Sequence, residues 1–370
     1  MADLEPIQMK GRIKRIFRNV KDKVDIIVIQ TATEPYVDRS FFYVTGLTQG
    51  VMEGSTAFLR PDGSVQILTS LLEAETAKGS GLPVAIMKSR EEREKKMKRF
   101  LRGSKKIGVN GAEMTHRSFV DIQKKAPKAE LIDVSEAIMK ARLVKDSKEL
   151  KLLSKAGRIA SEVVKEIIPF IDIGVREYEI GSELNYLMAK KGATGPFFDT
   201  IASSGPNTAE PHYSVGDRKI KRGDFVLLDF GALYKKYGSD LTRTFVVGKA
   251  TKKQKAMYET VRKAQMKSFA KLKEGQKGKV VHEAASKYIN RTKFKGRFTH
   301  GLGHSIGLAA HDGAGLGPGV DLILKRNMVF TIEPGVYIPG YGGVRIEDDI
   351  VVKKDGYELL TTADRELIEI

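Results

Sequence analysis

The chain contains no cysteine among its 370 residues. This absence excludes disulfide bonds, thiolate zinc sites and cysteine nucleophiles, so any metal site must use histidine and carboxylate ligands. No apolar run approaches the roughly 18 residues that span a bilayer. The N-terminal stretch MADLEPIQMKGRIKRIF lacks the apolar centre of a secretory signal. We therefore expect a cytoplasmic protein that does not use a membrane as a partner.

Phosphate-binding loops are also absent, since the pattern G-x-x-x-x-G-K-[ST] does not occur. The segment GLGHSIG, residues 301–307, places a histidine at its centre, and no acidic residue follows a clear βαβ unit. The glycine-rich segment HDGAGLGPG, residues 311–319, is interpreted as a loop that passes close to a ligand.

Acidic residues are outnumbered by basic ones, 46 to 64, which gives a formal charge of +18. Such an excess can indicate nucleic-acid binding. Here the charge is spread over helical-looking runs at 89–106 and 249–273. Acidic residues interrupt the first run, and neither run has the interleaved aromatics of a stacking platform. We expect solvated helix faces, with a polyanion surface as the alternative, and no nucleic acid as a main partner.

The length favours two domains. Residues 1–143 alternate strand-like and helix-like segments, including a buried strand at 23–30, a hairpin with an Asp-Gly turn at 55–69 and a basic helix at 89–101. Residues 144–370 begin with an amphipathic helix whose start signals are Asp146 and Ser147. Further helices and paired strands follow, so the expected fold class is α/β (α+β).

Histidine is scarce, yet three of the six lie within HGLGHSIGLAAH, residues 300–311. Neutral imidazole is a common metal ligand, although a structural cluster would explain any single one of them. His116 is interpreted as a surface or capping residue and His282 as a helix-surface residue.

Two pairs of carboxylates could complete a metal site. Asp229 follows two leucines on an apolar strand, and a hairpin turning around Tyr234 and Lys235 would set it opposite Asp240. Directly opposed side chains have Cβ atoms about 5 Å apart, so two anions there need a cation between them. The alternative is a turn aspartate beside an unrelated strand residue.

The second pair is Glu333 and Glu347, which are equidistant from Gly340, so a symmetric hairpin would place them face to face. With His304, the set becomes four carboxylates and one imidazole. Such ligands suit two divalent ions of Mn, Co, Fe or Zn, which together can acidify a shared water. His300 would then be placed, like His311, to touch the substrate.

The contexts LLDFGALY, SDLTRT, HGLGHSIGL, TIEPGVYI and GGVRIEDD, in this order, resemble those of the pita-bread metallopeptidases. The most similar branch is that of prolidase (Xaa-Pro dipeptidase) and aminopeptidase P. From about Lys145 onward the chain is similar to the catalytic domain, and SFFYVTGL is similar to part of the N-terminal domain. The resemblance implies a small N-terminal α/β domain, a curved antiparallel sheet flanked by helices in the second domain, and a homodimer.

The resemblance also implies roles for the ligands. Asp229 would chelate one ion, His304 and Glu333 the other, and Asp240 and Glu347 would bridge both. Manganese or cobalt is the expected metal, with zinc or iron as alternatives. A hydroxide held between the ions would attack the carbonyl that precedes proline, and Glu333 would pass a proton to the leaving nitrogen.

Four further residues match family positions at the substrate. By this resemblance, His212 would lie at the substrate site and His311 would stabilise the tetrahedral intermediate. Arg345 would orient substrate or carboxylates, and His300 would lie near the metals. The substrate implied is a small peptide with proline second, and a dipeptide is favoured by the short chain.

Two departures from the family pattern put the substrate length in doubt. Gly315 stands where some archaeal-type prolidases have an arginine that could bind the free carboxylate of a dipeptide, and Tyr213 replaces a frequent glycine. The alternatives are an aminopeptidase P that acts on longer peptides and a non-catalytic pita-bread protein that binds peptide or nucleic acid. Methionine aminopeptidase is disfavoured by the long N-terminal region, and a creatinase by the intact ligand set.

Overall fold

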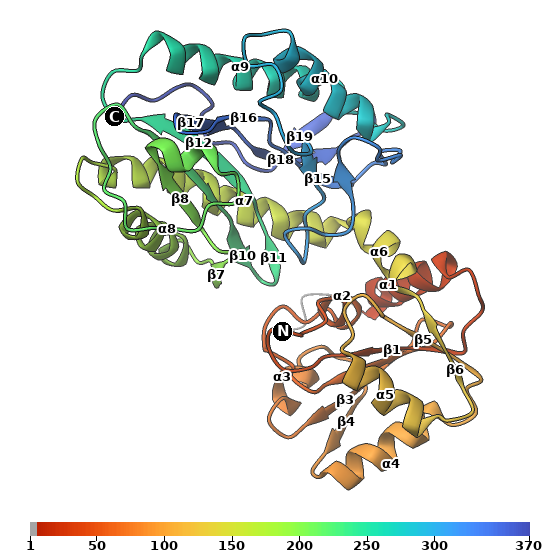
Figure 1. Cartoon of the computed structure of the whole chain (residues 1–370). Coiled ribbons are helices and arrows are strands. Elements are labelled where there is room, and N and C mark those ends of the chain that lie inside the picture. Colours follow the sequence, from red (N-terminus) through yellow and green to blue (C-terminus); the bar gives the residue numbers. More distant parts are fainter. Residues whose placement is uncertain (1–5) are drawn as a thin grey trace. The chain divides into compact units, whose positions relative to one another are not determined.

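The computed structural model describes residues 6–370. The chain divides into two compact units, residues 1–142 and 143–370, which are described one by one (Figure 1). The division lies one residue before the boundary expected from the sequence. No helix within residues 6–370 has both the length and the apolar character that crossing a membrane requires.

The N-terminal unit is built on a six-stranded sheet of order β4-β3-β2-β1-β5-β6. Only β2 runs against its neighbours, because β1, β3, β4, β5 and β6 are parallel to one another. The strands are β1 (Ile26–Gln30), β2 (Thr56–Leu59), β3 (Val65–Ser70), β4 (Val84–Met87), β5 (Lys106–Val109) and β6 (Glu130–Asp133). The helices are α1 (Pro6–Asn19), α2 (Ser40–Thr45), α3 (Ala74–Lys78), α4 (Arg90–Leu101), α5 (His116–Lys125) and α6 (Ser135–Leu143).

Local signals explain several of these elements. All five residues of β1 are buried, as expected for a strand with neighbours on both sides. The β2–β3 hairpin turns at Asp62 and Gly63, where Asp62 accepts a hydrogen bond from the Ser64 amide and Gly63 has φ +91°. Helix α4 begins after Ser89, whose side chain accepts from the Glu92 amide. The predicted hairpin and basic helix are thus confirmed.

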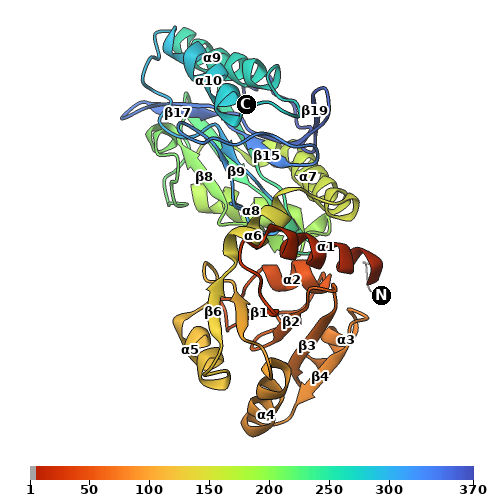
Figure 2. The same cartoon turned by 90° about the vertical axis from the view of Figure 1, so that its right-hand side faces the viewer.

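In the C-terminal unit, antiparallel strands lie between two pairs of helices (Figures 1 and 2). Helices α7 and α8 pack on one core cluster and α9 and α10 on the other. The helices are α7 (Ser147–Ile167), α8 (Glu177–Lys190), α9 (Lys252–Phe269) and α10 (Gly278–Asn290). The strands are β7 (Gly195–Pro196), β8 (Ile201–Ser204), β9 (Phe225–Phe230), β10 (Ala232–Tyr234), β11 (Tyr237–Gly238), β12 (Leu241–Val246), β13 (Gly303–His304), β14 (Gly315–Leu316), β15 (Val329–Ile332), β16 (Gly335–Ile338), β17 (Gly342–Arg345), β18 (Asp348–Val352) and β19 (Tyr357–Leu359).

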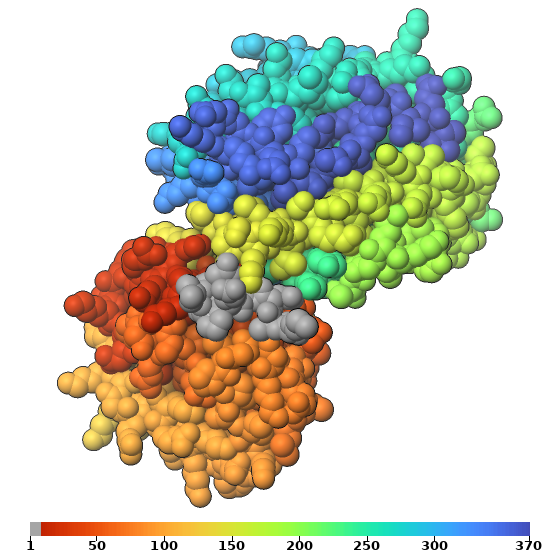
Figure 3. All heavy atoms as spheres, turned by 180° about the vertical axis from the view of Figure 1, so that it is seen from behind, coloured from red at the N-terminus to blue at the C-terminus, as the bar shows by residue number. Residues whose placement is uncertain are grey.

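Helix α7 begins at a capping box, in which the Asp146 side chain accepts from the Glu149 amide and Glu149 accepts from the Asp146 amide. The end of the chain lies along this helix (dark blue against yellow-green in Figure 3). A Cβ at Gly157 would stand 2.3 Å from the Leu360 carbonyl oxygen, so glycine permits this approach. The Thr362 amide then donates to the Ser161 hydroxyl at 2.8 Å.

The hairpin that carries the two aspartates has a register different from the predicted one. Its turn is centred between Lys235 and Lys236, which have φ +49° and +72°, as a two-residue turn of this hand requires. The register therefore pairs Asp229 with Thr242, and Asp240 lies two positions away from the predicted place opposite Asp229. A shift of two positions preserves the face, so both aspartates still project to the same side.

The hairpin that carries the two glutamates has the predicted register. Ile332 pairs with Asp348 in the β15–β18 ladder, and Gly335 pairs with Arg345 in the β16–β17 ladder. Both ladders share one register, so Glu333 and Glu347, which lie between them, occupy opposite positions.

Candidate metal centre

A cavity of about 380 Å³ in the C-terminal unit is lined by all nine residues that the sequence predicts as metal ligands or substrate contacts. They come from strands, from the ends of strands and from two loops. The remaining wall is mainly apolar and includes Phe198, Ile201 and Pro211. The nine are Asp229, Asp240, His304, Glu333, Glu347, His212, His300, His311 and Arg345.

The potential ligand atoms converge on His304. Its Nε2 atom lies 3.6 Å from Asp240 Oδ2 and 3.5 Å from Glu333 Oε1. One ligand atom each from Asp240, His304 and Glu347 fall within 4.8 Å of one another. This is an oxygen and nitrogen set of the kind that borderline and hard divalent ions accept.

The carboxylates of this cluster favour a cation between them. Burial, reinforced by the neighbouring carboxylates, raises the pKa of Asp240 and that of Glu347 well above the ordinary range. Burial also raises the pKa of Glu333 to about 8. Asp229 Oδ1 and Asp240 Oδ1 are buried without a hydrogen-bond partner, which is costly unless something polar meets them. The residues therefore fit bound divalent ions.

His304 is held in the form that binds metals. Burial, with the nearby His311, lowers its pKa to about 4, so the imidazole is neutral at physiological pH. The His304 backbone amide donates to the Thr331 hydroxyl at 3.0 Å, and this hydroxyl donates to Glu333 Oε1 at 3.2 Å. Thr331 thus links the two groups, a kind of support that orients metal ligands.

Arg345 connects both hairpins through its hydrogen bonds. Its Nη2 atom donates to Asp229 Oδ2 at 2.5 Å and its Nη1 atom to the Tyr337 hydroxyl at 2.8 Å. Its Nε atom donates to the Thr242 hydroxyl at 3.2 Å, which in turn donates to Glu347 Oε2 at 2.5 Å. Thr242 and Tyr337 lay outside the site predicted from the sequence. The two-residue alternation from Asp240 was a signal that could have found Thr242.

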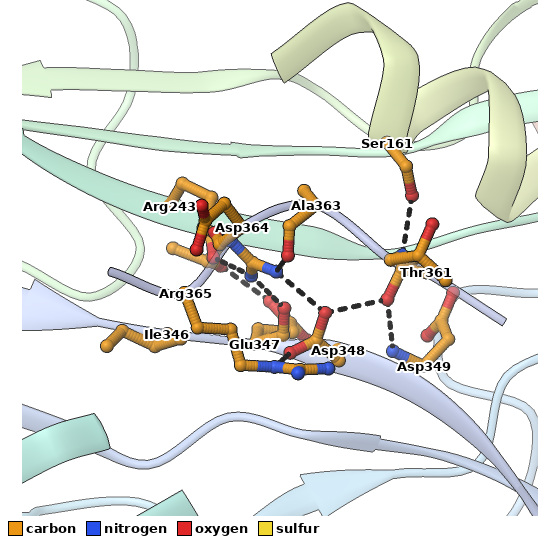
Figure 4. A network of polar contacts seen from close by, with 12 residues as sticks. Ser161, Arg243, Ile346, Glu347, Asp348, Asp349, Thr361, Ala363, Asp364 and Arg365 are labelled. Atoms are coloured by element: carbon orange, nitrogen blue, oxygen red, sulfur yellow. Dashed lines mark hydrogen bonds and ion pairs between the residues drawn. The ribbon is translucent and has the colours of Figure 1, made fainter. Parts of the chain in front are cut away.

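A second network fixes the backbone behind the ligands (Figure 4). Arg243, 2% exposed, donates to the Glu347 carbonyl at 2.6 Å and to Asp348 Oδ1 at 2.8 Å. Asp348 also accepts from Arg365. The carboxylate of the next residue, Asp349, accepts a hydrogen bond of 2.8 Å from the backbone amide of Asp240. The segment 347–349 therefore ties one ligand to the backbone of another.

The other histidines surround the cluster. His300 Nε2 lies 2.9 Å from the Tyr337 hydroxyl, and burial lowers the pKa of His300 to about 4. The ring of His311 lies 4.0 Å from that of His304, centroid to centroid, and His212 lies at the exposed rim. His282 corrects the prediction of a helix-surface residue: it is 6% exposed, because that position of α10 faces the core beside Phe298.

Comparison with known proteins identifies the family. Residues 151–354 match the model of metallopeptidase family M24, and residues 12–144 match the creatinase/prolidase N-terminal domain. The chain belongs to metallopeptidase family M24. It is therefore a metallo-exopeptidase, and the two-domain pita-bread fold inferred from the sequence is confirmed. Family membership implies divalent metal ions, with which the buried Asp, His and Glu groups are compatible.

Several relatives of this M24 protein match it over most of their length. An Xaa-Pro dipeptidase of Pyrococcus horikoshii is 37% identical over 365 residues, which cover 97% of this chain and 99% of the relative. The structure of an Xaa-Pro dipeptidase from Bacillus anthracis has a TM-score of 0.89 at 34% identity and covers 99% of this chain and 100% of its own. The structure of an X-Pro aminopeptidase from Thermotoga maritima has a TM-score of 0.90 at 30% identity, covering 97% and 100%.

Proposed function

We propose that this M24 peptidase hydrolyses the peptide bond that precedes proline in Xaa-Pro dipeptides, with two divalent ions bound by Asp229, Asp240, His304, Glu333 and Glu347. The observation that carries the proposal is the convergence of these five side chains, two with unpartnered buried oxygens, in one cavity. When bound, the ions would polarise the scissile carbonyl and lower the pKa of the attacking water.

The protein's own groups supply the remaining steps. Glu333 would take the proton from the attacking water and deliver it to the leaving proline nitrogen. Its Oε2 atom lies 4.0 Å from His300 Nδ1 and its Oε1 atom near His304, so it is close to both the ligands and the substrate side of the cavity. His311, whose ring contacts that of His304, and His212 at the rim would donate to the developing negative charge on the carbonyl oxygen.

The volume and the lining of the cavity support a short substrate. Its volume of about 380 Å³ lies near the lower end of small-molecule sites, which hold about 300–1,000 Å³. Phe198, Ile201 and Pro211 offer an apolar wall for the proline ring. The names of the dipeptidase relatives point to the same substrate.

One observation favours aminopeptidase P as the second candidate. The only permanent cation among the residues that line the cavity is Arg345, and its three guanidinium nitrogens all have protein partners. At Gly315, a Cβ would meet only the Gly303 carbonyl oxygen, at 3.7 Å. Among the residues that line the cavity, no permanent cation is thus left to hold the free carboxylate of a dipeptide, and the X-Pro aminopeptidase relative has a similar fold.

The test compares initial rates on Ala-Pro and on Ala-Pro-Ala after metal removal and resupply with manganese or cobalt. Metal-dependent turnover of Ala-Pro with the higher kcat/KM is the expected result. Turnover of Ala-Pro-Ala alone would assign the chain to aminopeptidase P. No turnover of either peptide by the metal-loaded protein would refute the peptidase mechanism and favour a binding protein.

Single substitutions test the metal site. Asp240→Ala and Glu347→Ala should each abolish turnover, because each removes a ligand proposed to be shared by both ions, while circular dichroism shows a folded chain. Glu358→Ala in strand β19 is the matched control, since Glu358 belongs to the same sheet as β18 but is exposed. Undiminished activity in either ligand variant would refute the dinuclear arrangement.

A further inference from the structure

The N-terminal unit contains a basic hollow between helices α4 and α5 that the peptidase reaction does not use. It has a volume of about 600 Å³ and is lined by five basic side chains and only two acidic ones. The α4 residues follow helical spacing, as do most of those from α5, so each helix turns one face to the hollow. The charged lining residues are Arg90, Arg93, Glu94, Arg117, Asp121, Lys124 and Lys125.

Part of this charge is already compensated within the protein, and part is not. Asp121 pairs with Arg93, whose Nη1 atom is 2.8 Å away, and also with Lys125. Within residues 6–370, Arg90 and Arg117 make no ion pair. Arg117 is in the first turn of α5, which has no acidic residue. A cation at the positive end of a helix dipole is unfavourable unless an anion is near, so the hollow favours an anionic ligand.

A second hollow of about 680 Å³ shares Arg90, Arg93, Arg117 and Asp121 with the first and extends to the end of strand β1. This edge is the carboxyl end of the parallel strands, where α4 follows β4 and α5 follows β5. It is also where the strand order changes direction, from β2 on one side of β1 to β5 on the other. Ligands of open α/β sheets bind at such a switch point.

Gln30 is an independent sign of a ligand. It is the last residue of β1, lines the second hollow and is only 9% exposed, yet its Oε1 atom has no hydrogen-bond partner. A buried acceptor without a donor is costly. A fully ionised inorganic anion such as sulfate would not satisfy it, because Oε1 needs an N–H or O–H group. Tyr36, 61% exposed, stands at the same hollow and offers a ring for stacking.

We propose that the N-terminal unit binds a nucleotide, with its phosphates on Arg90 and Arg117 and its base or ribose donating a hydrogen bond to Gln30. Guanidinium groups match phosphate oxygens as two-pronged donors, and Tyr36 stacks on the base. The same chemistry is present in a free nucleotide and in one nucleotide of a single-stranded nucleic acid. The proposal is independent of the peptidase function, since none of its residues lines the metal cavity.

The experiment titrates the metal-loaded full chain with unlabelled ADP as the probe and follows the heat of binding by isothermal titration calorimetry. Arg90→Gln combined with Arg117→Gln should weaken binding about a hundredfold, or about tenfold for each lost charge-assisted bond. The matched control, Lys95→Gln with Arg102→Gln, removes the same charge from exposed positions outside both hollows and should change the affinity less than threefold. Equal weakening in the two double variants, or no binding by the wild type at millimolar probe, would overturn the proposal.

Gln30→Leu distinguishes a nucleotide from a simple polyanion. It should weaken ADP about tenfold and leave the binding of tripolyphosphate, measured by competition, unchanged. Tripolyphosphate that competes as well as ADP, or ADP binding that is insensitive to Gln30→Leu, would refute nucleotide recognition. An RNA hexamer that binds through the same arginines at least tenfold more tightly than ADP would support the site and assign the nucleotide to a nucleic acid. Weaker hexamer binding would assign it to the free nucleotide.

Discussion

The acidic cluster should make the metal-free protein less stable as the pH rises from 7 to 9. Glu333 has a folded-state pKa of about 8, against an ordinary value of 4.5. Between these values the folded state holds more protons than the unfolded state, so stability is present at low pH and is lost as the pH rises through 8. Asp240 and Glu347 have pKa values shifted in the same direction and add to the loss.

The magnitude follows from the linkage relation. If Glu333 stayed protonated in the folded state and ionised in the unfolded state, the unfolding free energy would fall by 1.36 kcal/mol per pH unit, or about 2.7 kcal/mol from pH 7 to 9. Glu333 releases its proton in the folded state over the same interval, which returns about half, leaving a net loss of about 1.4 kcal/mol. His300 and His304, with pKa values lowered to about 4, oppose this by only about 0.3 kcal/mol together.

Urea unfolding of the metal-free chain at pH 7, 8 and 9, followed by circular dichroism, measures this slope. The relevant transition is the one that metal addition moves to higher urea, because the cluster belongs to the C-terminal unit. Metal-loaded protein should lose the slope, since ligated carboxylates are already ionised, and Glu333→Gln should reduce it by about 1.4 kcal/mol over the interval. Stability of the metal-free protein that stays level or increases from pH 7 to 9 would refute this account of the cluster.

Two substitutions test the groups that support the ligands. Thr242→Val removes the hydroxyl that joins Arg345 to Glu347, a proposed bridging ligand. It should weaken metal binding about 10–100-fold, measured by competition with a chelator. Unchanged affinity would show that the hydroxyl does not orient the ligand. Arg243→Met breaks a buried ion pair whose side chains are 2% and 0% exposed and should cost about 3 kcal/mol in urea unfolding. Arg262→Met, which breaks a more exposed pair, should cost less than about 1 kcal/mol, and equal costs would contradict the argument.

The two hairpins show what sequence symmetry can predict. Glu333 and Glu347 are set symmetrically around Gly340, and a turn at that glycine gives the predicted register. For Asp229 and Asp240 the same reasoning placed the turn one residue too early. Nothing in Tyr-Lys-Lys-Tyr marks the two lysines as the positions with positive φ, because glycine or asparagine usually fills them. Asp229 and Asp240 still project to the predicted common face, because the register differs by an even number of positions.

Contacts between distant segments could not be predicted from the sequence. Thr242 bonds with Glu347, and Arg345 bonds with Asp229, across more than 100 residues. His282 was interpreted as a helix-surface residue, yet its position on α10 faces the core. Helices α1 and α3 and strand β4 also lay outside the prediction. Strong local patterns, such as the capping box of α7 and the apolar run of β1, were enough to predict an element whose formation does not depend on knowing its tertiary contacts.

The charge balance of the cavity favours two ions over one. Its lining contains four carboxylates and one permanent cation, Arg345, while burial keeps His300 and His304 neutral. With all acids ionised, a net charge of −3 would be buried, which is costly without compensation. One divalent ion leaves the cavity negative, whereas two ions leave a single positive charge that one small anion cancels. We therefore expect two ions per chain by plasma emission after dialysis against excess manganese or cobalt. Saturation at one ion would contradict this balance, and Asp229→Asn, which removes a ligand proposed for only one ion, should lower the stoichiometry to one.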